Sequence, residues 1–209
     1  MNHGELLRLC GLTLPYGRVS ELTHTFQPGV HLVVGPNGIG KTSLLRAISG
    51  ALPATKGSIF LGDVSLGRFK NQVVLAPGMP PALPWLRAGL LIEFVVSLYP
   101  SSRRHADYQA RVLEHLRLSD AMDAPMGALS AGMAKKVLLA ATLIAAPAIM
   151  LFDEPINELD TASCEALLSL LAEYQNERIL LIATHHQTPF HEIVSGTLAL
   201  DGANMLPGQ

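Results

Sequence analysis

The sequence predicts an α/β fold built around a phosphate-binding loop, and three observations support this prediction. Residues 35–42, GPNGIGKT, fit the pattern G-x-x-x-x-G-K-[ST] at every fixed position. A short apolar segment, 31–34, precedes the loop as a buried strand would, and a helix-prone segment, 43–48, follows it. Two further apolar segments, 149–152 and 178–183, run into acidic and histidine side chains. Ligands of α/β folds gather at such carboxyl ends of strands.

The composition indicates a protein that shares part of its surface with a partner. Of the 209 residues, 49% are apolar and 15% are charged, so the chain is more apolar than a typical soluble domain. The net charge of −2 gives no indication of general nucleic-acid binding. Cys10 and Cys164 form no Cys-x-x-Cys pair, so we expect two buried, reduced cysteines in a cytosolic protein.

No segment has the pattern of a signal peptide or a membrane span. Residues 1–10 contain Glu5 and no uninterrupted apolar run. The longest apolar run, 137–152, is shorter than the roughly 18 residues expected of a membrane span, and Pro147 divides it. We interpret it as a buried helix followed by a buried strand, and we expect no direct membrane insertion.

Short strands and turns are expected in the first part of the chain. Strands are predicted at 6–14 and 21–26, before the strand that leads into the phosphate loop. The helix after the loop is expected to end at Gly50. Two more short strands, flanked by glycine-bearing turns, are predicted at 57–61 and 72–75.

A proline-rich connector and a helical insert follow. The connector, 77–84, contains four prolines, including Pro81, which favours neither a helix nor a central strand. Helices are predicted at 86–99, 106–116 and 134–146. We therefore interpret residues 1–209 as one domain, with a core at about 1–77 and 147–209 and a helical subdomain at about 78–146.

Strand character returns in the last part of the chain, at 149–152. A helix is predicted at 161–175, with Asp160 or Thr161 as its N-cap. Strands at 178–183 and 197–200 complete the expected core.

The chemistry of phosphate binding explains the residue types of the loop. Its glycines let successive backbone N–H groups turn inward around a phosphate. Lys41 adds a positive charge for the outer phosphates, and the Thr42 hydroxyl can ligate magnesium. The helix that continues through Ser43 would direct its positive end at the same phosphates. The expected nucleotide-binding residues of the loop are Gly35, Pro36, Asn37, Gly38, Ile39, Gly40, Lys41, Thr42 and Ser43.

Two carboxylates follow the apolar strand 149–152. The strand end places Asp153 at the carboxyl edge of the sheet, where it can hold magnesium through oxygen ligands. Glu154 would lie beside it and orient an attacking water. An acidic turn after a core strand is the alternative, and the phosphate loop in the same chain favours the functional interpretation.

Two other segments have polar residues at positions suited to anions. Ser130, with small neighbours, precedes the helix predicted at 134–146 and makes either a second anion site or a simple helix cap. His185 follows another apolar strand and can donate a hydrogen bond to a γ-phosphate oxygen. A metal site made of His185, His186 and His191 is disfavoured, because no cysteine or helical His-x-x-x-His pair accompanies them.

The order of these motifs resembles the nucleotide-binding domain of ABC (ATP-binding cassette) ATPases over nearly the whole chain. GPNGIGKT corresponds to Walker A, LSAGM at 129–133 to the LSGGQ signature, and IMLFDEP to Walker B with its glutamate. His185 matches the switch histidine, Tyr16 is placed like the aromatic residue that stacks on adenine, and NELD at 157–160 stands where the family has its D-loop. The resemblance implies a P-loop NTPase fold with a RecA-like core, an N-terminal antiparallel β subdomain and a helical subdomain insert.

The resemblance also implies roles for individual residues. Two copies would pair head to tail, and Ser130 and Gly132 of one copy would touch the γ-phosphate held by the other. The catalytic residues would be Lys41, Glu154 and His185; the Mg²⁺ ligands Thr42 and Asp153; the signature Leu129, Ser130, Ala131, Gly132 and Met133; and the D-loop residues Asn157 and Asp160.

Three departures from the family pattern stand out. Ala131 replaces a glycine of the signature, and Met133 replaces its glutamine. The glutamine of the family's Q-loop has no clear counterpart, because Pro77 or Gly78 takes its place and Gln72 comes too early, within a predicted strand. In the family that glutamine ligates magnesium and senses the membrane partner, so its absence bears on coupling and not on ATP binding.

The resemblance implies an ATP-hydrolysing subunit of an ABC transporter, with ATP and Mg²⁺ as cofactors. Such a subunit is cytoplasmic, peripheral on the inner face of the cell membrane, and bound as a homodimer to integral membrane subunits. A coupling helix of the membrane subunit would bind beside the helical insert, where 85–99 is unusually apolar. Packing within the insert itself is the alternative for any one of these residues. The short length and LSAG-type signature are similar to the haem-exporter ATPase of cytochrome c maturation.

Two other functions remain compatible with the motifs. A soluble ABC protein acting on DNA or the ribosome is disfavoured, because the chain has no long coiled-coil insertion, second cassette or basic patch. A regulatory subunit that binds ATP but hydrolyses it poorly is slightly favoured by the missing glutamine, whereas Glu154 and His185 argue against it.

Overall fold

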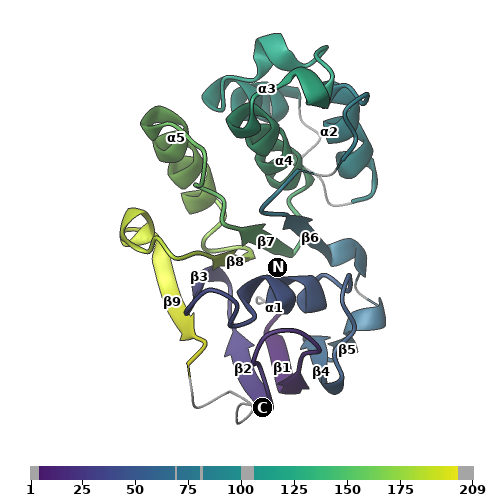
Figure 1. Cartoon of the computed structure of the whole chain (residues 1–209), viewed down its shortest axis with the longest axis vertical. Coiled ribbons are helices and arrows are strands. Elements are labelled where there is room, and N and C mark those ends of the chain that lie inside the picture. Colours follow the sequence, from purple (N-terminus) through teal and green to yellow (C-terminus); the bar gives the residue numbers. More distant parts are fainter. Residues whose placement is uncertain (1–4, 69, 81, 100–105, 202–209) are drawn as a thin grey trace.

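A computed structural model describes residues 5–68, 70–80, 82–99 and 106–201. Pro81 of the predicted connector lies outside these ranges, as do both ends of the chain. Two sheets and five α-helices make up the described part of the fold (Figure 1).

Five parallel strands form the central sheet, in the order β6-β7-β8-β3-β9 (Figure 1). They are β3 (Gly29–Val34), β6 (Val73–Ala76), β7 (Ile149–Asp153), β8 (Ile179–Ala183) and β9 (Val194–Ala199). Every residue of β7 and β8 is buried, because layers of the protein cover both faces of the sheet. This double burial explains why both segments are continuous apolar runs in the sequence.

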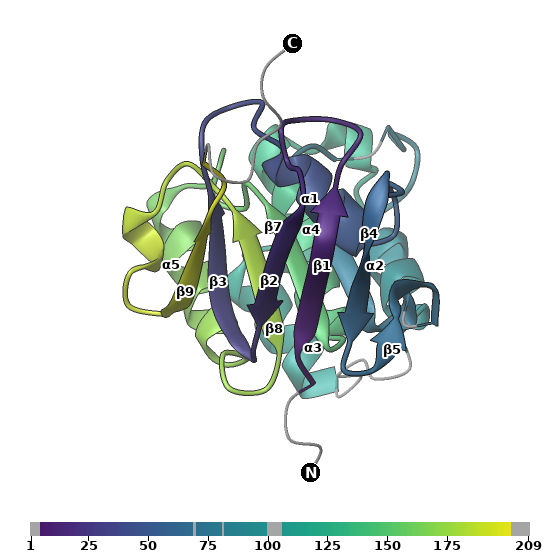
Figure 2. The same ribbon diagram turned by 90° about the horizontal axis from the view of Figure 1, so that it is seen from below.

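A four-stranded antiparallel sheet covers one face of the central sheet, with helix α1 (Lys41–Ile48) between the two (Figures 1 and 2). Its order is β2-β1-β4-β5. The strands are β1 (Leu7–Thr13), β2 (Leu22–Phe26), β4 (Lys56–Leu61) and β5 (Val64–Ser65). The two-residue strand β5 was not predicted, since it is too short for an alternation pattern to be visible.

Four helices cover the opposite face of the central sheet (Figure 1). They are α2 (Ala88–Ser97), α3 (Ala106–His115), α4 (Ala131–Ala145) and α5 (Thr161–Ala172). Successive strand residues point to opposite faces, so Leu151 and Leu181 pack in the core around α1, whereas Met150 and Leu180 pack against the helices. Among the described helices, none is both long and apolar enough to span a membrane.

Three details differ from the sequence-based expectations. Helix α4 begins at Ala131 and not near Ala134, because Ser130 caps it by accepting a hydrogen bond from the Met133 N–H at 3.2 Å. Gln72 ends a short 3₁₀ turn before β6 and does not lie within the strand. Neither cysteine is fully buried: Cys10 is exposed, since its inward-facing neighbour in β1 is Leu9, and Cys164 is half-buried; both are free.

Candidate functional site

Three segments with polar residues leave the central sheet at the same level. The carboxyl ends of β3, β8 and β7 are in register, with Val33 paired to Ala183 and Ala183 paired to Asp153. The phosphate loop, His185 and Glu154 come just after these three neighbouring strands. Parallel strands all end at one edge of a sheet, so the fold brings these segments together there.

The phosphate loop has a backbone that only glycine adopts at low cost. Gly35 has a φ of 148°, and a Cβ there would lie 2.6 Å from the Leu200 carbonyl oxygen. Gly38 has a φ of 76°, yet a Cβ there would meet nothing within 4 Å, so its glycine is required by conformation and not by space. The loop therefore keeps an open concave side, and the N-terminus of α1 begins directly after it.

Lys41 lies back over the loop. Its ammonium donates hydrogen bonds to the carbonyl oxygens of Gly35 at 2.7 Å and Pro36 at 3.2 Å. The residue is only 8% exposed, which fixes the charge beside the concave side of the loop. In this position the ammonium is near any phosphate that the loop holds.

The turn that carries Tyr16 rests directly on the phosphate loop. The Arg18 N–H donates to the Ile39 carbonyl at 2.9 Å, and a Cβ at Gly17 would lie 2.6 Å from the Gly40 Cα. Tyr16 itself is 67% exposed, so its ring is available for stacking. A hollow of about 420 Å³ is lined by Tyr16, Gly17, Asn37, Gly38, Gly40, Lys41, Thr42, Ser43 and Glu154.

Thr42 and Asp153 place three oxygen atoms together beside this hollow. The Thr42 hydroxyl lies 3.0 and 3.1 Å from the two carboxylate oxygens of Asp153, which is buried. Burial raises the pKa of Asp153, and the hydrogen bond from Thr42 opposes this rise only in part. A buried carboxylate with a hydroxyl next to it fits Mg²⁺, which prefers oxygen ligands and often binds through one carboxylate together with substrate phosphates.

Glu154 is held in an unusual backbone conformation. Its φ is 48°, in the left-handed region that costs a non-glycine residue about 1–3 kcal/mol. Its N–H donates to the Ala183 carbonyl at 2.8 Å, which ties it to the end of β8. Such strain is often stored at functional sites, and here it turns the carboxylate toward the phosphate-loop hollow.

The Glu154 carboxylate has one occupied and one free oxygen. Oε1 lies 3.0 Å from the Nδ1 of His185, which acts as the donor when that nitrogen is protonated. Oε2 is buried and has no hydrogen-bond partner among the described residues. A buried carboxylate oxygen without a partner is costly for the fold, and it is well suited to accept a proton or hydrogen bond from water.

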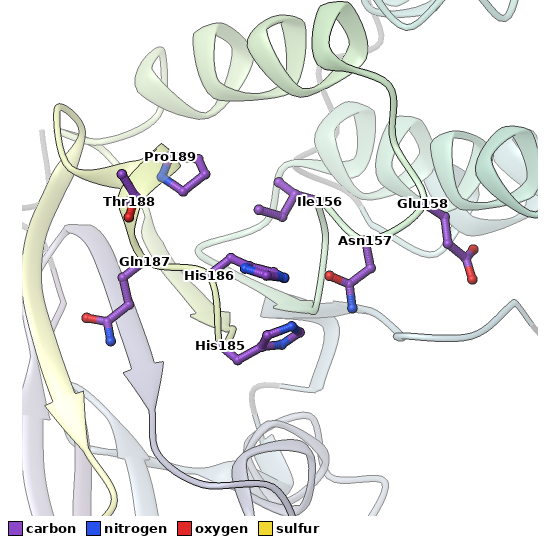
Figure 3. A pocket seen from close by; sticks show the side chains of 8 residues that line it. All are labelled: Ile156, Asn157, Glu158, His185, His186, Gln187, Thr188 and Pro189. Atoms are coloured by element: carbon purple, nitrogen blue, oxygen red, sulfur yellow. The ribbon is translucent and has the colours of Figure 1, made fainter.

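His185 also lines a second hollow, of about 730 Å³, beside the D-loop. The rings of His185 and His186 lie 3.9 Å apart between centroids, and both point toward the side of Asn157 (Figure 3). Glu158 points away from the two rings in the same view. Of the D-loop residues named from the sequence, Asn157 thus lies near the histidines.

Asp160, the other D-loop residue, caps helix α5. Its carboxylate accepts hydrogen bonds from the backbone N–H of Ser163 at 2.8 Å and from the Ser163 hydroxyl at 3.1 Å. The backbone hydrogen bond is the main reason that the pKa of Asp160 is lowered. The choice that the sequence left open between Asp160 and Thr161 is therefore settled in favour of Asp160.

The signature segment lies apart from the phosphate loop within one chain. Ser130, Ala131, Gly132 and Met133 line a separate hollow together with D-loop residues 158–160. This hollow shares none of its lining residues with the hollow at the phosphate loop. A Cβ at Gly132 would lie 2.6 Å from the Glu158 carbonyl oxygen, so the first turn of α4 packs closely on the D-loop. Leu129 packs against the core beneath it.

One residue close to the site was not singled out from the sequence. Lys135 is almost fully buried, and its ammonium binds the main chain of Asp153. The sequence contains a signal for it, because Lys135 and Lys136 interrupt an otherwise apolar helix, and buried lysines are uncommon unless they are paired.

Comparison with known proteins identifies the family to which this site belongs. The family model described as "ABC transporter" matches residues 19–157, a range that holds the phosphate loop, the signature segment and both carboxylates. The chain belongs to the ABC transporter family. Family membership makes it an ATP-binding subunit with ATPase activity of the ABC type.

Named relatives of this ABC protein include ATP-binding subunits with different tasks. It is 33% identical to the cytochrome c biogenesis ATP-binding export protein CcmA 2 of Cupriavidus metallidurans, over 75% of this chain and 76% of the relative. It is 29% identical to the bicarbonate transport ATP-binding protein CmpD of Synechocystis, over 82% of this chain and 63% of the relative.

Solved structures support the same fold. A putative ABC transporter ATP-binding protein from Pyrococcus furiosus superimposes with a TM-score of 0.79 and 26% identity, covering 93% of this chain and 97% of the other. The prediction of an ABC ATPase fold, with an antiparallel sheet joined to a RecA-like core and helices, is therefore confirmed.

Proposed function

We propose that this ABC ATPase binds Mg²⁺ and ATP at the phosphate loop and hydrolyses ATP with Glu154 as the residue that activates water. The observation that carries this proposal is that Glu154, whose Oε2 is buried and has no partner among the described residues, lines the same hollow as Lys41 and Thr42. A water hydrogen-bonded to the Glu154 carboxylate would lie next to the γ-phosphate and lose a proton as it attacks.

Each of the other residues has a separate task in this proposal. The loop N–H groups and Lys41 hold the phosphates, and the Tyr16 ring stacks on adenine. Thr42 and Asp153 would hold Mg²⁺, which neutralises charge on the β- and γ-phosphates. His185 orients Glu154 through Nδ1 and would donate to a γ-phosphate oxygen through Nε2, which requires a ring protonated on both nitrogens.

We propose that the site is completed by a second copy of the chain. Within one chain the signature segment lines its own hollow, so it does not close the hollow at the phosphate loop. In a head-to-tail pair, Ser130 and Gly132 of one copy would bind the γ-phosphate held by Lys41 of the other. Helix α4 begins there, and its N-terminal N–H groups suit an anion. ATP would thus draw the two copies together.

The membrane partner is proposed to bind at an exposed apolar stripe on α2. Leu90, Phe94 and Leu98 are 51%, 60% and 53% exposed and recur every four residues, which places them on one face of the helix. Leu91 and Val96 on the other face are buried in the chain's own core, so packing within the insert explains only part of this apolar segment. A short helix of a membrane subunit is the occupant that we propose for the stripe.

This contact gives the test of the transporter function. Replacing Phe94 by Asp puts a charge in the middle of the stripe and is expected to weaken binding to the membrane subunits by about 30-fold or more. Co-purification from membranes with the wild-type chain and the variant measures this loss. Replacing exposed Glu93 by Gln, one residue away, serves as the control. Equal recovery of membrane subunits with Phe94→Asp would contradict the proposed contact.

The comparisons favour a transporter subunit over a soluble protein acting on DNA or ribosomes, since both named relatives are transport or export subunits. We propose a peripheral location on the inner face of the membrane, and an export role like that of the cytochrome c biogenesis relative. We also propose that the chain divides into a core at about 1–77 and 147–209 and a helical subdomain at about 78–146. The alternative is a regulatory subunit that hydrolyses ATP weakly. The rate of ATP turnover by the purified chain distinguishes the two.

A further inference from the structure

Lys135 is a buried cation whose three donors are all directed at backbone oxygens. The residue is 1% exposed. Its Nζ donates to the carbonyl oxygens of Gly78 at 2.9 Å, Asp153 at 3.0 Å and Pro77 at 3.5 Å. An ammonium has three N–H donors, so these contacts account for all of them. A charge buried in this way is retained only where its hydrogen bonds are satisfied.

The three carbonyls lie where two neighbouring strands separate. Strands β6 and β7 pair up to Ala76 and Phe152. After this pair the chain following β6 leaves the sheet at Pro77, whereas β7 continues to Asp153. Lys135 thus joins the first residues of the connector to the last residue of the strand that carries the magnesium-binding carboxylate.

The connector also touches that carboxylate. A Cβ at Gly78 would lie 3.3 Å from Oδ2 of Asp153, so the Gly78 backbone packs against the carboxylate itself. Any displacement of Gly78 would change the space around Oδ2. This is the segment in which the sequence lacks the expected glutamine, and here Lys135 reaches it from a different part of the chain.

The charges around Lys135 are consistent with its contacts to Asp153 and the connector. Burial lowers the pKa of Lys135, and the nearby carboxylates of Asp153, Glu158 and Glu154 act in the opposite direction. Lys135 in turn is one of the groups that oppose the rise in the pKa of Asp153, which burial causes. The ammonium therefore acts on Asp153 through its main-chain oxygen and through its field.

We propose that Lys135 is a positioning residue that holds Asp153 and the start of the connector together and so links them to helix α4. Helix α4 starts with the signature segment, so one side chain connects the segment that would bind a second copy's ATP with the carboxylate that would hold this chain's Mg²⁺. The proposal rests on the proposed function of Asp153.

The neighbouring Lys136 provides a matched control. It is also buried, at 8% exposure, but its ammonium donates to the Ser163 hydroxyl at 3.2 Å and so joins α4 to α5. Replacing either lysine by Met removes one buried ammonium from the same helix and keeps a side chain of similar length. Only the Lys135 change removes contacts with Asp153 and Gly78.

The test compares Lys135→Met, Lys135→Gln and Lys136→Met with the wild-type chain in two measurements. The first is hydrogen exchange of the peptide spanning 74–80 in protein without nucleotide. The second is ATP binding measured with EDTA and again across a Mg²⁺ titration. Lys135→Gln keeps two N–H donors without the charge, and it replaces Lys135→Met in both measurements if the Met variant does not fold.

We expect Lys135→Met to speed exchange of the 74–80 peptide at least tenfold and to raise the Mg²⁺ concentration for half-maximal binding about tenfold. ATP binding with EDTA should change less than twofold, and Lys136→Met should change neither readout. Unchanged exchange and Mg²⁺ dependence in both Lys135 variants, or equal changes in Lys136→Met, would overturn the proposal. If wild-type ATP binding itself shows no response to Mg²⁺, the proposed function fails instead, and the exchange comparison still decides the role of Lys135.

Discussion

Replacing Glu154 by Gln is expected to lower ATP turnover by at least about 100-fold, because it removes the carboxylate that we propose takes the proton from water. The amide has nearly the same shape, so it can keep its contact with His185 and its place at the end of β8. ATP binding should therefore be retained. Phosphate release under single-turnover conditions, together with nucleotide affinity, measures the two effects separately.

The same variant should accumulate as an ATP-bound dimer. Binding would still draw two copies together, but the slow chemical step would no longer release them. Size-exclusion chromatography with ATP and Mg²⁺ measures this, with Glu165→Gln, an exposed change on α5, as the control. A Glu154→Gln chain that stays monomeric under these conditions, alone and with its membrane partner, would be incompatible with the paired arrangement.

Replacing Lys41 by Ala is expected to weaken ATP binding by roughly 10- to 100-fold, the usual worth of a hydrogen bond to a charged group. The ammonium is held over the loop by the Gly35 and Pro36 carbonyls, so it does not need to be reoriented from solvent to meet a phosphate. Isothermal titration with ATP, in both the presence and absence of Mg²⁺, provides the measurement.

The exposed Lys56 on β4 supplies the control for this change. Lys56→Ala also removes one positive charge, but outside the loop and on the antiparallel sheet. If Lys41→Ala and Lys56→Ala bind ATP equally well, the phosphate loop is not the site of binding. Thermal unfolding of both variants shows whether lost affinity reflects a lost fold.

The sequence was sufficient to place the phosphate loop, Asp153 and His185 at one edge of one sheet. Each of them follows a continuous apolar strand, and such strands can be found because both of their faces are buried. The parallel arrangement then brings the three strand ends together without further information. Local pattern and global topology agree here, which is why the prediction required no knowledge of side-chain contacts.

Other features depend on contacts between distant segments, which no local pattern contains. The start of α4 was placed too late, because Gly132 is a poor helix former and the Ser130 cap decides the boundary. Strained Glu154 is held by a hydrogen bond to Ala183, from a neighbouring strand. Lys135 gains its role from carbonyls that lie 57, 58 and 18 positions away in the chain.

The separation of the signature segment from the phosphate loop is the structural basis of the central claim, that each ATP site is built from two copies. Ser130→Asp suits a test of this claim, because Asp keeps the helix cap and sets a negative charge against the γ-phosphate. A Gly132 variant suits it less, because any Cβ there would press on the Glu158 carbonyl. Lys41→Ala damages the other half of the site.

The most direct measurement mixes these two damaged chains, both carrying Glu154→Gln, and counts the ATP retained in dimers isolated by size exclusion. In a mixed pair, the phosphate loop of the Ser130→Asp chain would meet the signature of the Lys41→Ala chain, and both of these are intact. We expect neither chain alone to dimerise with Mg²⁺ and ATP, and the mixture to form dimers that hold one ATP per pair. A mixture that forms no more dimer than the separate chains would show that the signature does not act across the pair, and would contradict the account.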